Sequence, residues 1–459
     1  MAGNAYVLGV GMSAFLKPRR QRAFTELAFE AGVKAMLDAH VTYDDVEAGV
    51  GCFCTLPSCS GQLCFYQFGM SDIPIYNTNN ACATGSTGLH MARNFVKGGL
   101  YDCVLVIGFE QMKPGALGGG TSDLPTPQTL SLKLMSQTRG DTKAPKNPQM
   151  FGNAGREYME KYGASAEDFG EIARISHEHS SRNPYAQFRD VYTLKQIMDS
   201  PMIHYPITKL QCSPTSDGAA AAVVVSQRFL DSRPELKSHA ILIAGQALKT
   251  DTPNLYSGSA MELVGFSTAG RAAKAAYADA GIGPKDVTVC ELHDCFSTNE
   301  LITLEGLGFC DEGKAHLMVR NGDITYGGKG PIINPSGGLI SKGHPLGATG
   351  LAQCAELTWQ LRGWANNGRL VKNTKYALQH NLGLGGACVV TVYTRADGKV
   401  NTDRAVPAEE IARLSGLGYN PAVEAKWVTP AQAKQVRSKK AGCDYALGET
   451  FSKLENVRL

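Results

Sequence analysis

The sequence predicts an α/β protein that consists of two similar halves, with an additional lobe inserted in the first half. Short apolar segments rich in Val, Ile, Leu and Ala alternate with helix-like segments along most of the chain. Such segments are typical of strands that helices cover on both faces. The chain has 459 residues, of which 43% are hydrophobic, so it can bury a large core and form two or three domains.

Similar segments in the two halves indicate a duplication. One pair is strand-like, one is a helix end followed by Asp-Val, and one is a glycine followed by a strand rich in small residues and valine. These pairs are residues 5–10 with 240–245, 37–46 with 278–287, and 217–225 with 385–393. Because internal similarity indicates a repeated structural unit, we expect a pseudo-twofold relation between the halves.

A fourth pair places two reactive side chains at equivalent positions. Ser-Thr-Gly-Leu at 86–89 matches Ala-Thr-Gly-Leu at 348–351, and each motif opens an apolar-periodic helix that a glycine ends. Cys82 and His344 each lie five residues before the threonine of their motif. We therefore expect them at facing helix N-termini. The two predicted helices span residues 84–96 and 347–361.

The pattern divides the chain into four parts. A stretch rich in Gly, Pro, Gln and basic residues interrupts the first half, and the chain becomes polar and Lys-rich after the second half, with short helices over 407–414 and 430–439. The expected parts are an N-terminal half-domain (1–112 and 211–237), an inserted loop lobe (113–210), a C-terminal half-domain (238–395) and a polar extension (396–459). The extension is too small for a core of its own.

Composition excludes several classes of function. The net charge is +3 and only 19% of residues are charged, which gives no reason to expect a nucleic-acid partner. No apolar run approaches the ~18 residues that membrane insertion requires. The 13 cysteines are scattered, which favours an intracellular, reducing compartment and not a secreted protein. The only local cysteine cluster, at 52, 54, 59 and 64, matches no common zinc spacing, so we expect no metal.

Cys82 is the first candidate for chemistry. It lies between a strand-like segment and a helix, in Asn-Asn-Ala-Cys-Ala-Thr-Gly-Ser at 79–86. A helix N-terminus favours the thiolate, which predicts a lowered pKa, and its N–H groups can bind an oxyanion. The alternative for a lone cysteine, a buried and inert thiol, is opposed by the neighbouring motifs.

His344 lies in a constrained loop rich in Gly and Pro, residues 334–350, that presents one imidazole. A helix N-terminus disfavours imidazolium, so this histidine suits the neutral role of accepting a thiol proton or polarising a carbonyl. The structural alternative is a histidine whose imidazole only makes hydrogen bonds within the loop and takes no part in chemistry.

His293 and Cys295 follow the apolar strand 287–292, at the strand end where α/β proteins place reactive groups. They alternate along an extended segment, so both side chains can point to the same side. We interpret Asp294, between them, as a loop or capping carboxylate. The glycine-rich segment 381–387 includes Gly385, and we expect its backbone N–H groups to be the donors available to a ligand. Its spacing matches neither nucleotide fingerprint.

With these motifs in order, the sequence resembles the thiolase superfamily, and most closely the thiolases of the sterol carrier protein x type. The resemblance covers residues 1–395 and rests on Cys-Ala-Thr-Gly-Ser at 82–86, His-Asp-Cys-Phe at 293–296 and Gly-His-Pro at 343–345. It implies the thiolase fold, two half-domains in a five-layered α-β-α-β-α architecture, with a loop lobe that covers coenzyme A.

The sequence departs from the commoner thiolases at the second catalytic cysteine. Those enzymes carry Cys-x-Gly where this chain has Gly383-Leu-Gly385, and Asn-Glu-Ala-Phe where it has His-Asp-Cys-Phe. The sterol-carrier type makes both changes, which implies that Cys295 is the second thiol. We expect Cys388 to be structural. The extension is too short and charged for a lipid-carrier domain, so sterol transfer is not implied.

The resemblance implies an acyltransferase of lipid metabolism that cleaves or forms 3-ketoacyl-coenzyme A. Cys82 would be the nucleophile and His344 its base, with N–H groups of Cys82 and Gly385 on the first oxyanion. His293 and His344 would stabilise the enolate of acetyl-CoA, and Cys295 would be the second acid–base group. The alternatives are a decarboxylating ketoacyl synthase, which uses a cysteine with two histidines, and a non-catalytic acyl-CoA- or lipid-binding protein.

The expected partners are acyl-CoA and coenzyme A as substrates, with no tightly bound cofactor; Phe296 is the residue that we expect against coenzyme A. By analogy with the family, we expect a homodimer or homotetramer. The location is expected to be an organelle matrix, peroxisome-like or mitochondrial. Val457-Arg-Leu459 resembles a peroxisomal tripeptide but has Val in place of a small residue, and Ser452-Lys-Leu454 is internal.

Overall fold

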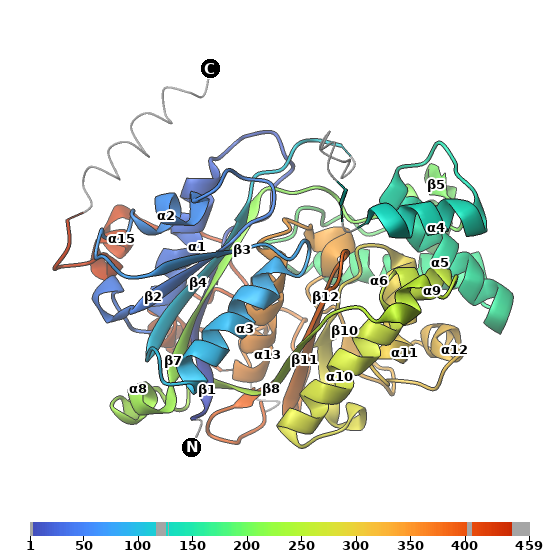
Figure 1. The fold of residues 1–459 in the computed structure, drawn as a ribbon. Helices are drawn as coiled ribbons and strands as arrows, with labels where there is room; N and C mark the ends of the chain where they lie inside the picture. Colours follow the sequence, from blue (N-terminus) through green and yellow to red (C-terminus); the bar gives the residue numbers. More distant parts are fainter. Residues whose placement is uncertain (1–2, 116–124, 127, 402–405, 443–459) are drawn as a thin grey trace.

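The computed structural model describes residues 3–115, 125–126, 128–401 and 406–442, and both C-terminal tripeptides lie outside these ranges. Ten strands form one hydrogen-bonded sheet (Figure 1). In spatial order they are β10 (Ile332–Ile333), β9 (Val287–Glu291), β11 (Tyr376–Gly383), β12 (Ala387–Arg395), β8 (Ile241–Lys249), β1 (Ala5–Met12), β7 (Gly218–Ser226), β4 (Cys103–Glu110), β2 (Ala48–Cys52) and β3 (Ile75–Thr78).

The two halves of this sheet have the same strand order. In the first half, β7 lies antiparallel between β1 and β4, and β2 is parallel to both β4 and β3. In the second half, β12 lies antiparallel between β8 and β11, and β9 is parallel to both β11 and β10. The halves join where β1 pairs with β8, at Tyr6–Leu242 and Val7–Ile241. The predicted α/β class and duplication are therefore confirmed.

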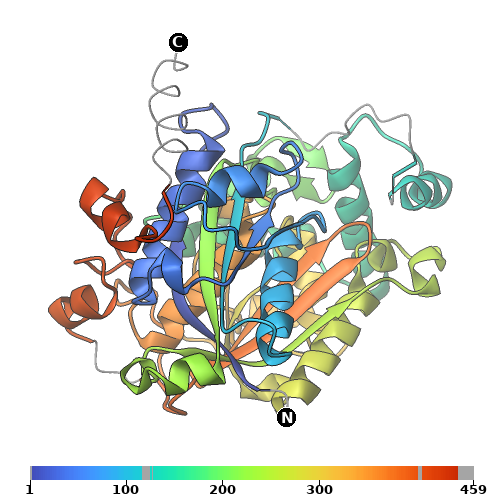
Figure 2. The ribbon, with the colours of Figure 1, turned by 60° about the vertical axis from the view of Figure 1, so that its left-hand side comes forward.

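Helices complete a layered arrangement around the two half-sheets. Helix α1 (Phe24–Asp38) packs on β1, β7 and β4, and α10 (Phe266–Ala280) packs on β8 and β12. Between the half-sheets lie α3 (Thr84–Lys97) and α13 (Thr349–Arg362), which contact each other and strands of both halves (Figures 1 and 2). The five layers expected from the resemblance are present, with the two strand layers joined at one pair of strands.

The N-termini of α3 and α13 approach each other closely because glycines line the contact. A Cβ atom added to Gly85 would lie 2.7 Å from the Gly347 carbonyl oxygen, closer than a side chain tolerates. Helix α3 begins where the sequence predicts it, whereas α13 begins two residues later, at Thr349, because the N–H groups of Ala348 and Thr349 close a turn on the Pro345 carbonyl. Gly98 and Gly363 cap the two C-termini.

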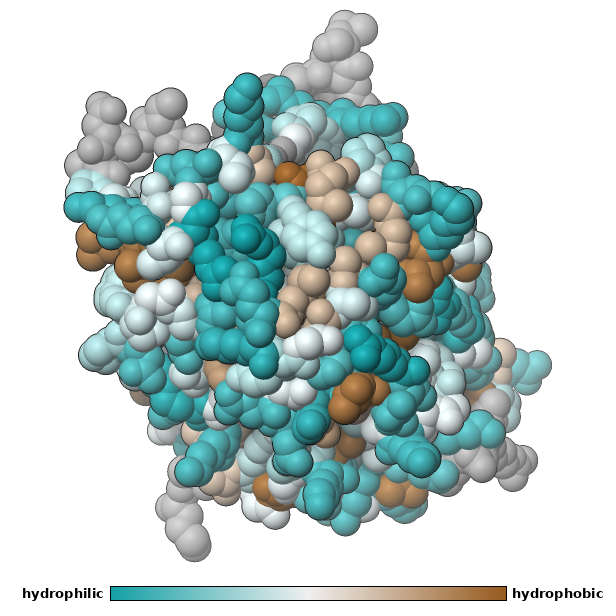
Figure 3. All heavy atoms as spheres, turned by 90° about the vertical axis from the view of Figure 1, so that its right-hand side faces the viewer, coloured by the Kyte–Doolittle hydropathy of each residue, from teal (hydrophilic) through white to brown (hydrophobic). Residues whose placement is uncertain are grey.

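The interrupting segment forms a mainly helical lobe beside the second half (Figure 1). Its elements are α4 (Thr129–Arg139), α5 (Lys146–Tyr162), α6 (Ala166–Ser180), α7 (Leu194–Asp199), β5 (Met202–His204) and β6 (Ile207–Thr208). Helix α5 packs on α9 (Ala260–Leu263) and α11 (Ser297–Gly306), and α6 packs on α11 and α12 (Ala315–Arg320). Viewed from this side, the surface is mainly hydrophilic with small hydrophobic areas (Figure 3).

The polar extension is folded against the rest of the molecule. Its helices are α14 (Ala408–Leu414) and α15 (Pro430–Val436), close to the predicted ranges, and α15 packs on α1. Ile411 and Ala422 are fully buried, and the carbonyl of Ala422 accepts a hydrogen bond from buried Arg369. The extension thus has no core of its own. Ile411 and Ala422 join a hydrophobic cluster to which both halves contribute, and Ala433 and Val436 join a cluster formed mainly by the first half. The remaining short helices are α2 (Ser60–Phe65) and α8 (Gln227–Asp231).

No helix among the residues described above has the length and apolar character needed to cross a membrane.

Candidate active site

Three of the side chains singled out in the sequence meet at one point. Cys82 lies in the turn before α3, His293 follows β9, and His344 precedes α13. The Cys82 sulfur and one ring nitrogen of each histidine lie within 4.8 Å of one another. The two imidazole rings meet edge to face, with centroids 5.1 Å apart. Ala81, next to Cys82, has a left-handed φ of 48°, a strained conformation of the kind that often occurs at functional sites. The duplication has brought the Cys82 and His344 turns face to face.

A cavity of about 800 Å³ opens onto this point. Cys295 lines it and is only 6% exposed, and its backbone carbonyl accepts a hydrogen bond from the Ser213 N–H. Phe296 also lines it and packs on Phe151, with ring centroids 4.9 Å apart. The remaining lining is largely apolar, with basic residues among it: Phe188, Tyr192, Ile203, Leu210, Ile340, Leu382 and Leu384, with Lys17, Arg19 and Lys209.

The hydrogen bonds of His344 leave one nitrogen with a free lone pair. Its Nδ1 lies 2.8 Å from the Thr349 hydroxyl, whose only hydrogen is donated to the Pro345 carbonyl 3.0 Å away. Nδ1 must therefore be the donor to Thr349, because the hydroxyl has no second hydrogen. In the neutral ring Nε2 then carries the lone pair, and it is buried without a hydrogen-bond partner. Burial, together with the nearby Lys342, lowers the pKa of His344 to about 3, so the ring is neutral.

The predicted lowering of the Cys82 pKa is wrong for the free protein. Loss of hydration around the sulfur raises its pKa to about 12; a backbone hydrogen bond opposes this rise and the charge of Glu110 adds to it. The helix N-terminus does not compensate for this desolvation. The site at rest therefore holds a thiol beside a neutral imidazole, and a thiolate forms only as its proton is transferred. The lone pair on His344 Nε2 suits that transfer.

The pKa of the second thiol, Cys295, is also raised. Burial raises the pKa of Cys295 well above its ordinary value, and the neighbouring Cys82 and Asp294 raise it further. Because desolvation disfavours the thiolate of each residue, both Cys82 and Cys295 are thiols at neutral pH in the empty site. Cys388 is fully buried in β12, consistent with the structural role expected for it.

His293 is held on both sides. Burial lowers its pKa well below the ordinary value, and the other two histidines beside it, His344 and His380, add to this shift. Its Nδ1 lies 2.9 Å from the side-chain nitrogen of Asn381, and its carbonyl accepts a short hydrogen bond from Asn299. The ring is neutral, and its other nitrogen, Nε2, takes no part in the contact with Asn381.

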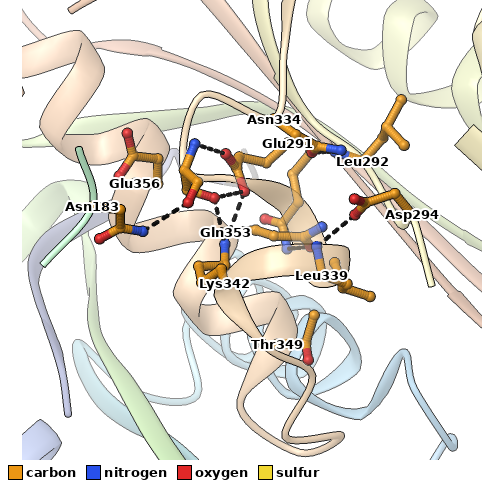
Figure 4. Close-up of polar contacts among 12 residues, drawn as sticks. Asn183, Glu291, Leu292, Asp294, Asn334, Leu339, Lys342, Thr349, Gln353 and Glu356 are labelled. Carbon is orange, nitrogen blue, oxygen red and sulfur yellow. Dashed lines mark hydrogen bonds and ion pairs between the residues drawn. The ribbon is translucent and has the colours of Figure 1, made fainter. Parts of the chain in front are cut away.

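Asp294 caps the turn that leads to His344, as its sequence position suggested. Its carboxyl group accepts the N–H of Leu339 at 2.6 Å (Figure 4) and that of Ile340 at 3.4 Å, within the π-helical turn Gly338–Lys342. Gly338 is required here, because a Cβ would lie 2.0 Å from the Asp294 carboxylate. The loop after β9 and the His344 loop are thereby tied together.

A buried ion pair supports the same turn. Lys342 Nζ lies 3.0 Å from the Glu291 carboxylate and donates to Ser336 Oγ at 2.7 Å, and Ser336 donates to Glu291 through both its N–H and its hydroxyl (Figure 4). Both charged groups are at most 1% exposed. A second carboxylate, Glu110, accepts N–H groups of Cys54 and Thr55 and also that of Gly347, which joins the His344 loop to the first half.

Gly385 lies in the turn between β11 and β12, with a φ of 107°, and lines an adjoining cavity of about 520 Å³. That cavity shares Leu382 and Leu384 with the larger one. Two residues earlier, a Cβ on Gly383 would lie 2.1 Å from the Asn80 carbonyl. The backbone of the Cys82 loop thus excludes a side chain at 383, the position at which the commoner thiolases carry a cysteine.

Sequence reasoning missed the residues that orient the two histidines. Thr349 and Asn381 are buried partners of His344 and His293, and Glu110 ties the loops together. The first two belong to motifs that were identified, but their side chains could be assigned only from the packing. Within the described part of the chain, Cys82, His293 and His344 are also the only group of three that could hold a metal ion.

Two family models match the chain. The thiolase N-terminal domain matches residues 6–200, and the thiolase C-terminal domain-like model matches residues 251–395. The chain belongs to the thiolase family. The sterol carrier protein 2 of Rattus norvegicus is 50% identical over 394 residues, which cover 85% of this chain and 72% of that protein.

More distant relatives carry enzyme names. An acetyl-CoA acetyltransferase of Methanothermobacter thermautotrophicus is 32% identical over 380 residues, 81% of this thiolase and 95% of the relative. The crystal structure of human mitochondrial 3-ketoacyl-CoA thiolase in complex with CoA aligns with a TM-score of 0.61 at 18% identity, covering 86% of this chain and 98% of that one. This last likeness concerns the fold alone.

Proposed function

We propose that this thiolase cleaves or forms the carbon–carbon bond of 3-ketoacyl-coenzyme A through an acyl-enzyme on Cys82. The observation that carries the proposal is the meeting of Cys82 with two neutral histidines at the end of an apolar cavity, one of them with an unpartnered Nε2 lone pair. Family membership supports acyl transfer, and in the degradative direction the reaction is that of β-oxidation.

The first step forms the bond to sulfur. The Cys82 sulfur attacks the 3-keto carbon as His344 Nε2 takes its proton, so the raised pKa of the thiol is overcome only in the presence of substrate. Backbone N–H groups of Cys82 and Gly385 stabilise the oxyanion. In this proposal the backbone N–H of Gly385 is the second donor, presented by a turn whose φ of 107° at this residue favours glycine.

In the second step the bond between C2 and C3 breaks, and its electron pair becomes the enolate of acetyl-CoA. His293 and the protonated His344 donate hydrogen bonds to the enolate oxygen, and Cys295 gives a proton to C2. In the third step Cys295 takes the thiol proton of free coenzyme A, whose sulfur attacks the acyl-enzyme. Cys82 leaves as a thiolate and takes its proton back from His344. The kinetics are ping-pong.

Coenzyme A is a substrate here and not a resident cofactor. We place its thiol-bearing arm in the 800 Å³ cavity against Phe296, where the apolar lining suits a chain that must reach Cys82 and Cys295. The inserted lobe covers this cavity with Phe151, and its basic side chains are candidates for the phosphates: Lys133, Arg139, Lys143, Lys146 and Arg156.

Cleavage of acetoacetyl-CoA with added coenzyme A, and of longer 3-ketoacyl-CoAs, tests the proposal. Wild type should be active, Cys82→Ala should be inactive, and Cys295→Ala should lose turnover. Full activity of Cys295→Ala would refute the role given to that thiol. No activity of wild type on any of these substrates would favour a decarboxylating synthase, or a binding protein if malonyl-type substrates also fail.

We also propose that the chain forms a homodimer or homotetramer. Strand β3 pairs only with β2 and forms one edge of the ten-stranded sheet in the described structure, so its outer backbone groups can pair with a second copy. Light scattering during size-exclusion chromatography measures the mass, and a monomer at all concentrations would contradict the proposal. The proposed location is a peroxisome-like or mitochondrial matrix, which imaging of the tagged protein tests.

A further inference from the structure

A chain of buried side chains leads from the core of the second half to His293. The Tyr393 hydroxyl donates to Gln379 Oε1 at 2.5 Å, and Gln379 Nε2 donates to Ser86 Oγ at 2.8 Å. Ser86 Oγ lies 3.1 Å from Asn381 Oδ1, and Asn381 Nδ2 lies 2.9 Å from His293 Nδ1. The first four side chains are at most 1% exposed, so water does not replace these contacts.

The direction of each hydrogen bond in this chain is determined by its neighbours. Gln379 Nε2 also lies 2.7 Å from the Gly350 carbonyl, which can only accept, so this end of the amide is the donor. Ser86 therefore accepts from Gln379, and its single hydrogen is left for Asn381 Oδ1. Asn381 must then turn its NH₂ group toward His293, and no rotation of either amide preserves all of these contacts.

The last bond decides where His293 carries its proton. Because Asn381 donates, His293 Nδ1 accepts, and the single proton of the neutral ring lies on Nε2. His344 has the opposite arrangement, since its Nδ1 donates to Thr349 and its Nε2 bears the lone pair. The two imidazoles that face Cys82 are thus different tautomers.

We infer that Ser86 and Asn381 are positioning residues that hold His293 as the Nε2–H tautomer, so that it enters the reaction as a hydrogen-bond donor while His344 enters as the base. The inference rests on the proposed function and refines it. Both halves then contribute to the orientation of His293, because Ser86 lies on α3 of the first half and Asn381 on β11 of the second. A partner that could turn freely would leave His293 Nε2 as an acceptor part of the time, and the enolate oxygen would then receive a hydrogen bond from the protonated His344 but none from His293.

The tautomers can be observed directly. In the full-length wild-type protein labelled with ¹⁵N-histidine, long-range proton–nitrogen correlation spectra distinguish protonated from unprotonated ring nitrogens. His293 should show a proton on Nε2 and His344 on Nδ1, with assignments from His293→Gln and His344→Gln. His179 is an internal reference, because its Nδ1 faces the Asn334 carbonyl and must donate. A proton on Nδ1 of His293 would overturn the inference.

A matched pair of variants tests the consequence for the reaction. In Asn381→Asp the carboxylate can only accept, so it draws a proton to His293 Nδ1 and raises the pKa of the ring. The doubly protonated ring keeps its Nε2 donor, and that donor is lost as pH rises through the raised pKa. We expect kcat of Asn381→Asp to fall by about 10²-fold over this range, the effect of removing one oxyanion donor, with little change in KM.

Asn381→Leu removes the partner without supplying a charge, so its kcat should be lower than that of wild type and should lack this alkaline loss. Thermal unfolding of both variants shows whether they are folded. A pH profile of Asn381→Asp with the shape of the wild-type profile would overturn the inference. If wild type is inactive but shows the expected tautomers, the proposed function fails and the positioning role on His293 stands; an active wild type with the other tautomer overturns the inference alone.

Discussion

Cys82 combines two features that act in opposite directions on its thiol. Backbone N–H groups at the start of α3 favour the thiolate, whereas desolvation disfavours it, and the pKa of about 12 shows that desolvation dominates. The buried His344 disfavours its own charged form in the same way, with a pKa of about 3. The neutral pair is therefore the resting state. In the proposed reaction the substrate supplies the oxyanion, and its contacts with backbone N–H groups make the proton transfer favourable.

Alkylation of Cys82 by iodoacetamide should accelerate with pH throughout the neutral and alkaline range. The thiolate is the reactive form, and with a raised pKa its fraction keeps increasing with pH up to about 12. Peptide mass spectrometry at a series of pH values gives the rate at Cys82. The variant Cys59→Ser is the control, since Cys59 is exposed and consumes reagent. A rate that levels off near neutral pH would show a thiolate at rest.

Burial also changes the protonation state of Asp294. Three carboxyl groups, Glu291, Asp294 and Glu300, are buried near one ammonium group, that of Lys342, which pairs with Glu291. Burial, with Glu291 nearby, raises the pKa of Asp294 to about 8 in spite of its two backbone donors, so it is largely protonated at neutral pH.

Asp294→Asn should weaken the pH dependence of stability. From the ordinary aspartate pKa near 4 up to about 8, the folded protein holds a proton that the unfolded chain has released, so wild-type stability falls as pH rises through this range. The amide mimics the protonated carboxyl and has no such dependence. Thermal midpoints measured from pH about 5 to 9 should decline less in the variant. Parallel curves for the two proteins would indicate an ionised Asp294.

At the scale of elements, the internal similarity of the sequence predicted the strands, the two central helices and the facing of Cys82 and His344. The local signals were sufficient because periodicity, terminal glycines and repeated motifs agreed. They could not predict how close the elements come. The contact of Gly383 with the Asn80 carbonyl, the Glu110 bridge between loops and the partners of His293 all depend on tertiary packing between distant segments.

Gly383→Ala should destabilise the protein and slow the reaction. Its Cβ would lie 2.1 Å from the Asn80 carbonyl and 3.1 Å from the Ala83 nitrogen, so the Cys82 loop must move, at a cost of roughly 1–3 kcal/mol. Thermal unfolding and the rate of acetoacetyl-CoA cleavage measure both effects. Gly283→Ala is the matched control, because a Cβ there meets only Asp286, at 3.9 Å. Equal stability of the two variants would contradict the close contact.

At the scale of the whole molecule, the chain continues past its second half-sheet and returns to the first. The extension places Ile411 and Ala422 in the core and packs α15 on α1, the outer helix of the first half. Composition alone suggested a polar tail, because charged residues are frequent in it and its apolar residues form only short runs. Their burial follows from a surface that only the folded halves create.

Truncation after Arg395 should lower the thermal midpoint or cause aggregation. It removes the Ala422 carbonyl that Arg369 contacts at 2.8 Å and the Glu424 carbonyl that the Tyr185 hydroxyl contacts at 3.2 Å, and it exposes apolar surface on α1. A second truncation, after Gly442, is the control because it retains α14 and α15. Equal midpoints for the two truncated proteins would mean that the packed extension contributes no stability.

The central claim, an acyl-enzyme on Cys82 that needs Cys295 for turnover, is tested most directly by intact-protein and peptide mass spectrometry. Cys295→Ala would be mixed with a 3-ketoacyl-CoA in the absence of free coenzyme A and quenched in acid. We predict an adduct with the mass of the shortened acyl group, located on Cys82, and no adduct in Cys82→Ala. An adduct on another residue, or none on wild type and Cys295→Ala alike while the substrate is consumed, would contradict the proposed mechanism.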